Sequence, residues 1–362
     1  MSATEALTEA NRLMVVCNSC RYCEGLCAVF PAMEMRTAFS DGDLNYFANL
    51  CHSCGACHAD CQFTAPHEFN VNVPQTLARV RNDAYAAYAW PRAFAPMFGR
   101  SRVAANVVGV LCILGFVIGL VTANEPGVHT APGDFYSLMP HNAMAALFGA
   151  ALCYAIFALA MGLRNFWRDI GESNATLTDG VSLWQAIKDA ASLRYLDGGG
   201  VGCFNEDDRP NDRRRLYHHF TMYGFLLCFA ATCIATLYHY LLGREAPYAW
   251  YDLPVLLGTL GGIGLTVGAS GLLWARRRRN PELQDGTRQA MESALSWNLL
   301  LVAVTGLLLL ALRGTQAMET MLALHLGSVL LLFVTMPYGK FVHGIYRFAA
   351  LVRYAKERRA LH

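Results

Sequence analysis

The sequence predicts a mainly α protein with two parts, a small cysteine-rich domain over residues 1–102 and a bundle of membrane-spanning helices over residues 103–362. Hydrophobic residues make up 54% of the 362 residues and charged residues only 15%, whereas a soluble domain carries about a quarter charged residues. Eight of the 13 cysteines fall within the first 61 residues, which favours metal binding over a disulfide scaffold. A net charge of +2 argues against a nucleic-acid-binding protein.

The N-terminal domain begins with an acidic, polar stretch rather than a signal peptide. Residues 1–10 have neither a positively charged start nor an apolar run, and no long apolar stretch occurs before residue 103. We therefore expect this domain to stay in the compartment of synthesis, the cytoplasm.

Six apolar stretches follow, each close to the roughly 20 residues that a helix needs to cross the hydrocarbon core of a bilayer. They are residues 103–123, 141–163, 218–242, 254–275, 293–312 and 318–342. A polar connection, 164–217, separates the second from the third and contains a candidate amphipathic helix at 182–195. In the fourth stretch, Gly264-x-x-x-Gly268 allows a neighbouring helix to approach closely.

The basic residues set the expected orientation. With the N-terminus inside, only two of the 29 Lys and Arg residues, Arg244 and Arg313, fall in the outer loops. Basic loops stay on the cytoplasmic side, so we expect both termini, the cysteine-rich domain and the loop 164–217 to be cytoplasmic. The predicted location is the cytoplasmic (inner) membrane, crossed several times.

Two cysteine runs carry the most specific signal in the chain. Each has the spacing C-x2-C-x2-C-x3-C that binds [4Fe–4S] clusters in ferredoxins, where the fourth cysteine ligates the other cluster of a pair. The runs are Cys17, Cys20, Cys23 and Cys27, then Cys51, Cys54, Cys57 and Cys61. The expected ligands of one cluster are Cys17, Cys20, Cys23 and Cys61. Those of the other are Cys51, Cys54, Cys57 and Cys27.

The alternative for these cysteines is a pair of zinc sites, because four thiolates also bind zinc, but zinc ligands usually come as two separated C-x2-C pairs. Ferredoxin runs normally place proline directly after the last cysteine, whereas Ala28 and Gln62 stand there, a change that removes no ligand. The segment 28–50 has a helical pattern, so we expect a helical two-cluster ferredoxin-like domain. Three histidines beside the second run are expected to be polar neighbours rather than ligands: His52, His58 and His67.

Histidines in the apolar stretches predict a second kind of cofactor, because ionisable residues inside a membrane are costly and point to function. His218 and His219 begin the third stretch and His239 ends it. His325 and His343 lie 18 residues apart on the sixth, which is five helical turns. With these two helices antiparallel, His218 or His219 meets His343 at the cytoplasmic side. His239 then meets His325 at the outer side. Imidazole pairs of this kind ligate haem b, so we expect a cytochrome b-like bundle with one or two haems.

Several alternatives stay open for the histidines. Helical phase relative to His239 favours His218 over His219 as the ligand, but helix crossing also permits His219. The histidines could instead be interfacial residues, as the Tyr-His-Tyr sequence around His239 indicates, and a single-haem bundle would keep one pair only. His129 and His141 lie in or beside an outer loop without a partner at matching depth, and we assign them structural roles.

The remaining cysteines and glycines predict no further site. Cys203 follows the glycine run 198–202 in the cytoplasmic loop and is either a redox thiol or part of a turn. No Gly-x-Gly-x-x-Gly unit follows a strand pattern and the glycine run lacks Gly-Lys-Ser/Thr, so the chain has no recognisable site for a flavin or nicotinamide of its own. Four cysteines in apolar stretches are expected to act as small apolar side chains: Cys112, Cys153, Cys228 and Cys233.

Several strings resemble the tricarballylate/citrate utilisation protein B family. Besides the cysteine runs, they are residues 66–74 (PHEFNVNVP), 85–91 (YAAYAWP), 193–203 (LRYLDGGGVGC) and 218–225 (HHFTMYGF). The resemblance spans most of the chain, from about Cys17 to His343. The membrane half is also similar to the cytochrome b subunits of nitrate reductases, chiefly between His325 and His343 and at Pro337.

The resemblance implies an electron-transfer subunit rather than a complete enzyme. Such a subunit reoxidises the FADH2 of a separate cytoplasmic dehydrogenase, which oxidises tricarballylate to cis-aconitate. It passes the electrons through two [4Fe–4S] clusters and haem b to the membrane quinone. Two alternatives remain, a subunit of a different respiratory dehydrogenase or reductase complex, and a haem-free membrane-bound ferredoxin with a role in assembly or regulation.

Overall fold

The computed structural model describes residues 4–95, 102–123, 135–173, 176, 178–206, 209–286 and 289–361. Its secondary structure confirms the mainly α prediction. Within these residues no β-strand forms, and one isolated bridge pairs Cys203 with Asn211.

The N-terminal domain, called the head below, is built from short helices with well-defined starts. Thr4 accepts a hydrogen bond from the amide of Leu7, and Ser40 and Asp43 form a capping box. Asn72 caps the last long helix of the head. The helices are α1 (Glu5–Cys20), α2 (Val29–Glu34), α3 (Asp41–Leu50), α4 (Ala56–Ala59) and α5 (Val73–Tyr88). The helical pattern predicted for residues 28–50 is therefore confirmed by α2 and α3.

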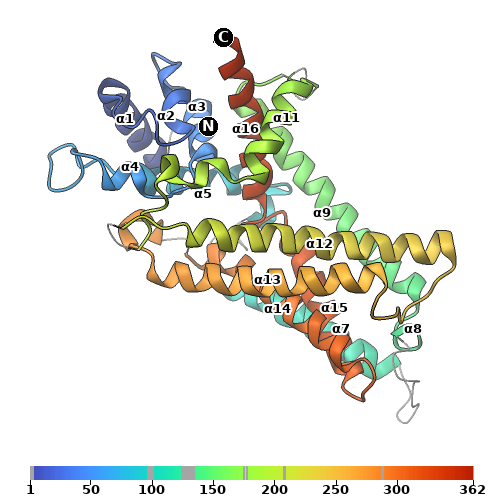
Figure 1. The fold of residues 1–362 in the computed structure, drawn as a ribbon. Coiled ribbons are helices and arrows are strands. Elements are labelled where there is room, and N and C mark those ends of the chain that lie inside the picture. Colours follow the sequence, from blue (N-terminus) through green and yellow to red (C-terminus); the bar gives the residue numbers. More distant parts are fainter. Residues whose placement is uncertain are drawn as a thin grey trace.

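The core of the head also contains segments from the end of the chain. Tyr46 and Phe47 of α3 are fully buried in one hydrophobic cluster with Phe166 and Tyr346. Phe166 belongs to the end of α9 (His141–Asp169) and Tyr346 to α16 (Val342–Ala360). Figure 1 shows α16 rising among the head helices, next to α11 (Gly180–Ala191). Residues far outside 1–102 thus complete the head.

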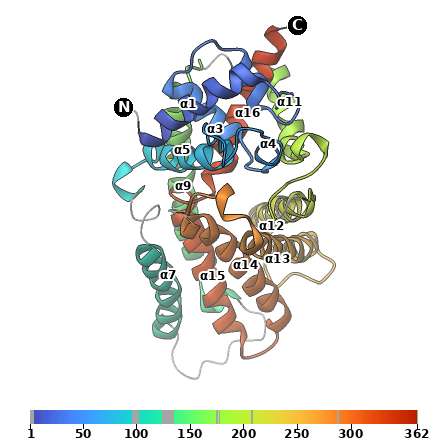
Figure 2. The same ribbon diagram turned by 90° about the vertical axis from the view of Figure 1, so that its left-hand side faces the viewer.

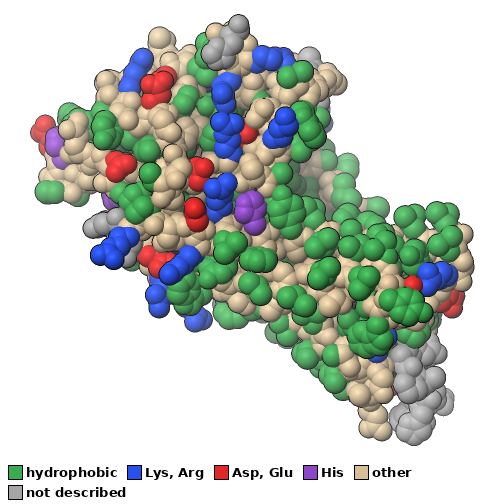
Figure 3. Space-filling view, in the orientation of Figure 1, with side chains coloured by type: hydrophobic (Ala, Val, Ile, Leu, Met, Phe, Trp, Pro, Cys, Tyr) green, Lys and Arg blue, Asp and Glu red, His purple; other side chains and the backbone are tan. Residues whose placement is uncertain are grey.

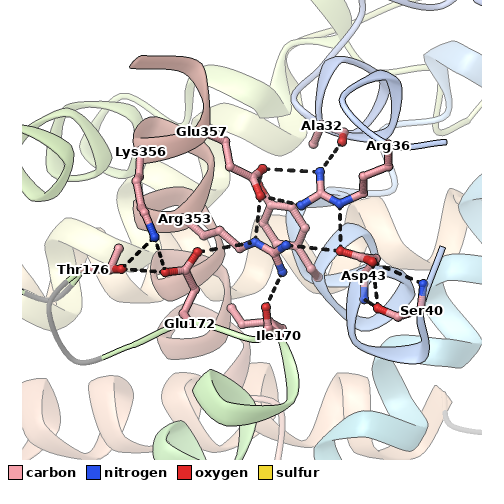
Figure 4. Close-up of polar contacts among 11 residues, drawn as sticks. Ala32, Arg36, Ser40, Asp43, Ile170, Glu172, Thr176, Arg353, Lys356 and Glu357 are labelled. Atoms are coloured by element: carbon pink, nitrogen blue, oxygen red, sulfur yellow. Dashed lines mark hydrogen bonds and ion pairs between the residues drawn. The ribbon is translucent and has the colours of Figure 1, made fainter. Parts of the chain in front are cut away.

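An ionic network fixes α16 to the head, with Arg353 at its centre (Figure 4). The Arg353 guanidinium lies 3.1 Å from a carboxylate oxygen of Asp43, 2.8 Å from Glu357 and 3.7 Å from Glu172. Arg36 bonds both Asp43, at 2.7 Å, and Glu357. Because these residues come from three distant parts of the sequence, the network joins the two ends of the chain.

Among the described residues, five helices are long and apolar enough to cross a membrane, and they mark a multi-pass membrane protein. They are α9, α12 (Arg213–Leu242), α13 (Leu253–Arg278), α14 (Gln289–Leu312) and α15 (Met318–Thr335). The first predicted crossing, 103–123, lies in α7 (Arg102–Ala123), whose described apolar part is the shorter Val107–Gly119. A sixth crossing therefore stays a prediction.

The predicted sixth stretch, 318–342, is not one continuous helix. Helix α15 ends at Thr335 with Met336 as its C-cap, and α16 begins at Val342 after a series of turns. Pro337 explains the break, because it has no backbone N–H with which to continue the helical hydrogen bonds after Met336. His325 and His343 consequently lie on two different helices.

The arrangement of the long helices also differs from the prediction that the third and sixth stretches run side by side. Helix α12 packs on α13, α13 on α14, α14 on α15, and α15 on α7. In both ribbon views the α12–α13 hairpin lies across α14 and α15 (Figure 1 and Figure 2). The two predicted partners are therefore separated by two intervening helices over most of their length.

The surface of the molecule divides as the composition predicts. Charged side chains gather over the head, whereas the part formed by α12 and α13 is covered mainly by hydrophobic side chains (Figure 3). Exposed residues of this hairpin include Phe229, Leu237, Leu260 and Ile263. Such a continuous apolar surface fits a lipid environment.

Candidate functional site

The four cysteines of one predicted set line a single cavity in the head. Cys17 and Cys20 belong to the last turn of α1, while Cys23 and Cys61 lie in turns, and all four face a cavity of about 220 Å³. Burial and the neighbouring thiols Cys23, Cys61 and Cys20 raise the pKa of Cys17 to about 12. We call these four residues the first cysteine group.

The other four cysteines form a second, more deeply buried group. Burial and the thiols of Cys54 and Cys51 raise the pKa of Cys27. The pKa of Cys57 is raised in the same way, by burial and then by Cys54, Cys27 and Cys51. The amide of Ser53 donates to the sulfur of Cys51 at 3.3 Å. The second cysteine group therefore consists of Cys27, Cys51, Cys54 and Cys57.

The two groups exchange their fourth members. Cys27 leaves the first run to join the second group, and Cys61 leaves the second run to join the first, which is the crossed ligation of two-cluster ferredoxins. Within the described residues, no three His, Cys, Asp or Glu side chains are close enough to hold a single metal ion. The first cysteine group instead surrounds a cavity, as ligands that bind separate irons of one cluster must.

Of the predicted histidines, the structure brings His218 and His343 together. Their ring centroids are 6.0 Å apart and the ring planes are inclined by 68°. His343 Nδ1 donates to the carbonyl oxygen of Lys340, which leaves Nε2 unprotonated and able to bind a metal. His219, one residue along α12, instead stacks against Tyr223.

His218 and His343 line a cavity of about 570 Å³ between the head and the long helices. Apolar side chains form much of its wall, among them Met222 and Phe225. The cavity also receives His52 from the second cysteine run. We call it the junction cavity, because it lies where the head and the long helices meet.

The polar wall of the junction cavity is strongly basic. Six cationic side chains line it, with two carboxylates, Glu206 and Glu292. Glu292 pairs with Arg276 at 2.7 Å and with Lys340 at 3.2 Å. Burial lowers the pKa of Lys340 to about 7 even though Glu292 acts to raise it. The six cations are Arg81, Arg214, Arg276, Arg279, Lys340 and Arg347.

The predicted outer pair, His239 with His325, is not brought together. His239 stacks on His141 of α9, with ring centroids 3.5 Å apart. His325 packs against α14, where its Nδ1 lies 3.2 Å from the hydroxyl of Thr305. The physical reason is the crosswise course of α12, whose far end reaches α9 rather than α15. His141, which the sequence left without a partner, thus has one, and His129 lies outside the described residues.

The structure also gives positions for His52 and Cys203 that the sequence analysis did not predict. His52 was expected to be a polar neighbour of the cysteines, and the structure adds that it lines the junction cavity. Cys203 is buried, with its sulfur 3.1 Å from the carbonyl oxygen of Leu196, and packs against Cys54. Of the two roles considered for Cys203, this position fits the structural one. The only sequence signals were the place of His52 inside a cysteine run and the glycines before Cys203.

Comparison with known proteins agrees with these observations. A family model described as "Citrate utilization protein B Fer4-like domain" matches residues 10–87, which cover both cysteine runs, and "Citrate utilization protein B" matches residues 100–362. A protein of Escherichia coli named "Citrate utilization protein B" is 47% identical over 358 residues, 98% of this chain and 94% of that protein. No solved structure matches. The predicted resemblance is thus confirmed, and the chain belongs to the citrate utilization protein B family.

Proposed function

We propose that this chain is the membrane electron-transfer subunit of an oxidoreductase. It would accept electrons from the reduced FAD of a cytoplasmic dehydrogenase, which the resemblance predicts to act on tricarballylate. When bound, two [4Fe–4S] clusters and a haem b would carry single electrons towards the quinone pool of the inner membrane. The observation that carries the proposal is the junction cavity, which His52 lines from the second cysteine run and His218 and His343 line from the long-helix side.

The cysteine groups suit an inward route for electrons. Cys20 in the first cysteine group is exposed, so a soluble donor can approach that group. In the second cysteine group Cys51 and Cys54 are buried, and their segment borders the junction cavity. The first group would therefore receive electrons and the second would pass them on.

The residues around the junction cavity fit a haem b. The imidazoles of His218 and His343, with ring centroids 6.0 Å apart, line the same cavity and would hold the haem iron between them. The apolar wall suits a porphyrin. Arg276 Nη2 is buried without a hydrogen-bond partner, so it can donate to a carboxylate of a haem.

The proposal takes the single-haem alternative and His218 as the ligand. His219 does not line the junction cavity, and His239 and His325 each contact other residues. The cytoplasmic position of the head and of both termini rests on the distribution of basic residues. Electron transfer through a ferredoxin-like domain is what the family match supports most directly.

A reduced-minus-oxidised spectrum of membranes with and without the overproduced chain tests the proposal. The wild-type chain should add a b-type α-band. His218→Ala and His343→Ala should each remove it, because each takes away one axial ligand. The matched controls His219→Ala and His325→Ala should retain it at equal protein level. A band that persists in His343→Ala would contradict the proposed ligand pair, and a wild-type chain without the band would favour the haem-free ferredoxin alternative.

A further inference from the structure

Four arginines converge on the backbone of the second cysteine run. They come from four different elements: Arg81 from α5, Arg214 from α12, Arg279 from the residue after α13, and Arg347 from α16. All four donate to oxygen atoms of residues 48–53. Elements far apart in the sequence therefore place positive charge around one short loop.

Two of these arginines bind the carbonyl oxygen of a cysteine. Arg81 Nη1 and Arg347 Nη2 each donate to the carbonyl oxygen of Cys51 at 2.8 Å. Arg81 is only 5% exposed. Burial, with the nearby charge of Arg81, lowers the pKa of Arg347 to about 10, a value at which Arg347 still carries its charge at neutral pH.

The other two arginines bind Ser53 of the same loop. Arg214 Nη1 and Arg279 Nη2 donate to the carbonyl oxygen of Ser53 at 2.8 and 2.9 Å. Burial lowers the pKa of Arg279 to about 9, and its Nε has no hydrogen-bond partner. Arg279 is thus a cation held in a poorly solvated place.

None of the four arginines forms an ion pair with a carboxylate in the described parts of the chain. Two carboxylates line the same cavity, Glu292 and Glu206. Glu292 directs its ion pairs to Arg276 and Lys340 instead, and within the described residues Glu206 forms no ion pair with the four arginines. Backbone carbonyls satisfy hydrogen bonds but do not neutralise charge, and buried cations without a counter-charge are destabilising. This excess of positive charge calls for an anion beside residues 48–53.

An iron–sulfur cluster on the second cysteine group would be that anion. The four thiolates outweigh the charge of the iron–sulfur core, so the whole site is negative and becomes more negative when it gains an electron. Hydrogen bonds and nearby charges are among the factors that set the potentials of such clusters. Positive charges therefore stabilise the reduced form more than the oxidised form.

The first cysteine group has the opposite surroundings. The residues that line its cavity include Asp60 and, among those described, no arginine or lysine. Asp60 adds to burial and to the thiols of Cys61 and Cys20 in raising the pKa of Cys23, so its carboxylate is close enough to be felt there. Because its charged neighbour is negative and Cys20 is exposed, no comparable positive charge would stabilise a reduced cluster at this group.

We propose that Arg81, Arg214, Arg279 and Arg347 act as positioning residues that raise the reduction potential of the second cluster above that of the first. The inference rests on the proposed function, because it requires both clusters. In the step that it favours, the first cluster is oxidised and the second is reduced by the same single electron, and no bond or proton moves. The arginines thereby set the inward direction of transfer.

A redox titration of the purified full-length protein, followed by the EPR signals of the two clusters, tests this inference. Arg279→Gln and Arg347→Gln should each lower the reduced-to-oxidised ratio of one cluster about tenfold at a given potential, which is about 59 mV for a one-electron couple. The other cluster should not change. Arg279→Lys, which keeps the charge, should stay close to wild type, and Arg244→Gln, which removes a guanidinium paired with Asp252, should leave both clusters unchanged.

Asp60→Asn provides a second arm that does not depend on the arginine variants folding. It should raise the potential of one cluster only, and in the wild type this cluster should be the lower-potential one. The inference is overturned if the cluster whose potential rises in Asp60→Asn is the higher-potential one in the wild type. It is also overturned if the glutamine variants retain both clusters and the two potentials either do not shift or shift equally. A wild-type protein that lacks two clusters at full iron loading would instead overturn the proposed function.

Discussion

The head and the α12–α13 hairpin are held together by opposite kinds of contact. In the head, Arg353 joins three carboxylates from distant parts of the chain. In the hairpin the helices approach without charge, since a Cβ added to Gly268 would lie 2.4 Å from the backbone nitrogen of Thr221. In the head, ion pairs determine how the elements pack. In the apolar hairpin, glycines determine the packing, because they leave room for the neighbouring helix.

This difference predicts that different substitutions should destabilise the head and the hairpin. The head should lose much of its stability when Arg353 is lost, because three carboxylates would then share only two cations, Arg36 and Lys356, and one buried negative charge would be uncompensated. The hairpin should fail when a single methyl group is gained, because two backbones already touch. Three changes, taken from the largest expected effect to the smallest, test the comparison.

Arg353→Ala is expected to have the largest effect, a loss of about 3–5 kcal/mol in the free energy of unfolding of the head. The side chain of Arg353 is only 11% exposed, and Glu172, at 7%, would lose a buried partner. Chemical unfolding of the detergent-purified chain, followed by a probe in the head, measures the loss. Arg359→Ala is the matched control, because the half-exposed Arg359 pairs with Asp179 at the surface and should matter little. Equal stability of the two variants would show that the network does not hold the head together.

Gly268→Ala should destabilise the hairpin by about 1–3 kcal/mol, the usual cost of overpacking. The new methyl group would meet backbone atoms of α12, which cannot rotate away. The control is Gly258→Ala on the same helix, where the nearest atom, the Cβ of Ala231, lies at an ordinary 3.8 Å. Unfolding in a denaturing detergent compares the two variants, and a Gly268→Ala chain as stable as wild type would contradict the close approach.

The cysteine groups were the most predictable part of the molecule. Their pattern is local, because the spacing within each run dictates which thiols share one loop, and the expected exchange of the fourth cysteine follows from a known rule for two-cluster ferredoxins. The glycine pattern around Gly268 was predictable for the same reason. It describes a contact between helices that are neighbours in the sequence.

The histidines show where this reasoning stops. Pairing His239 with His325 required the relative direction of two helices, and sequence periodicity contains no information about a crossing angle. His343 meets His218, but from a separate helix that begins after the break at Pro337. The sequence therefore predicted the right partner for His218, but it placed that partner on a continuous helix that the structure does not have.

The arginines around residues 48–53 could not have been predicted. Arg81, Arg214, Arg279 and Arg347 are spread over most of the chain, and no spacing relates them to one another or to the cysteines. In the sequence, Arg214 and Arg279 belong to basic clusters that indicate only which side of a membrane they occupy. Their convergence is a property of the fold alone.

The smallest expected effect concerns the acid sensitivity of the head. Burial would raise the pKa of Asp43, but hydrogen bonds from Ser40 and Arg36 outweigh burial, and the pKa is lowered in the folded protein. The unfolded chain then binds more protons than the folded chain as the pH falls below the ordinary pKa of about 3.9. Asp43 therefore adds stability that is present above that pKa and is lost as the pH falls towards its folded pKa.

Asp43→Asn should remove this contribution, so its unfolding free energy should fall less than that of wild type between pH 6 and about pH 3. Asp41→Asn is the control, because Asp41 is exposed in the same first turn of α3 and should keep the wild-type pH dependence. The atoms nearest to a Cβ on Gly268 belong to Thr221 and to the backbone of Tyr217, neither of which takes up a proton in this pH range, so a probe in the hairpin should report the same pH dependence for both variants. An Asp43→Asn head that loses stability in acid as steeply as wild type would mean that other carboxylates of the network, such as Glu172, dominate the acid response.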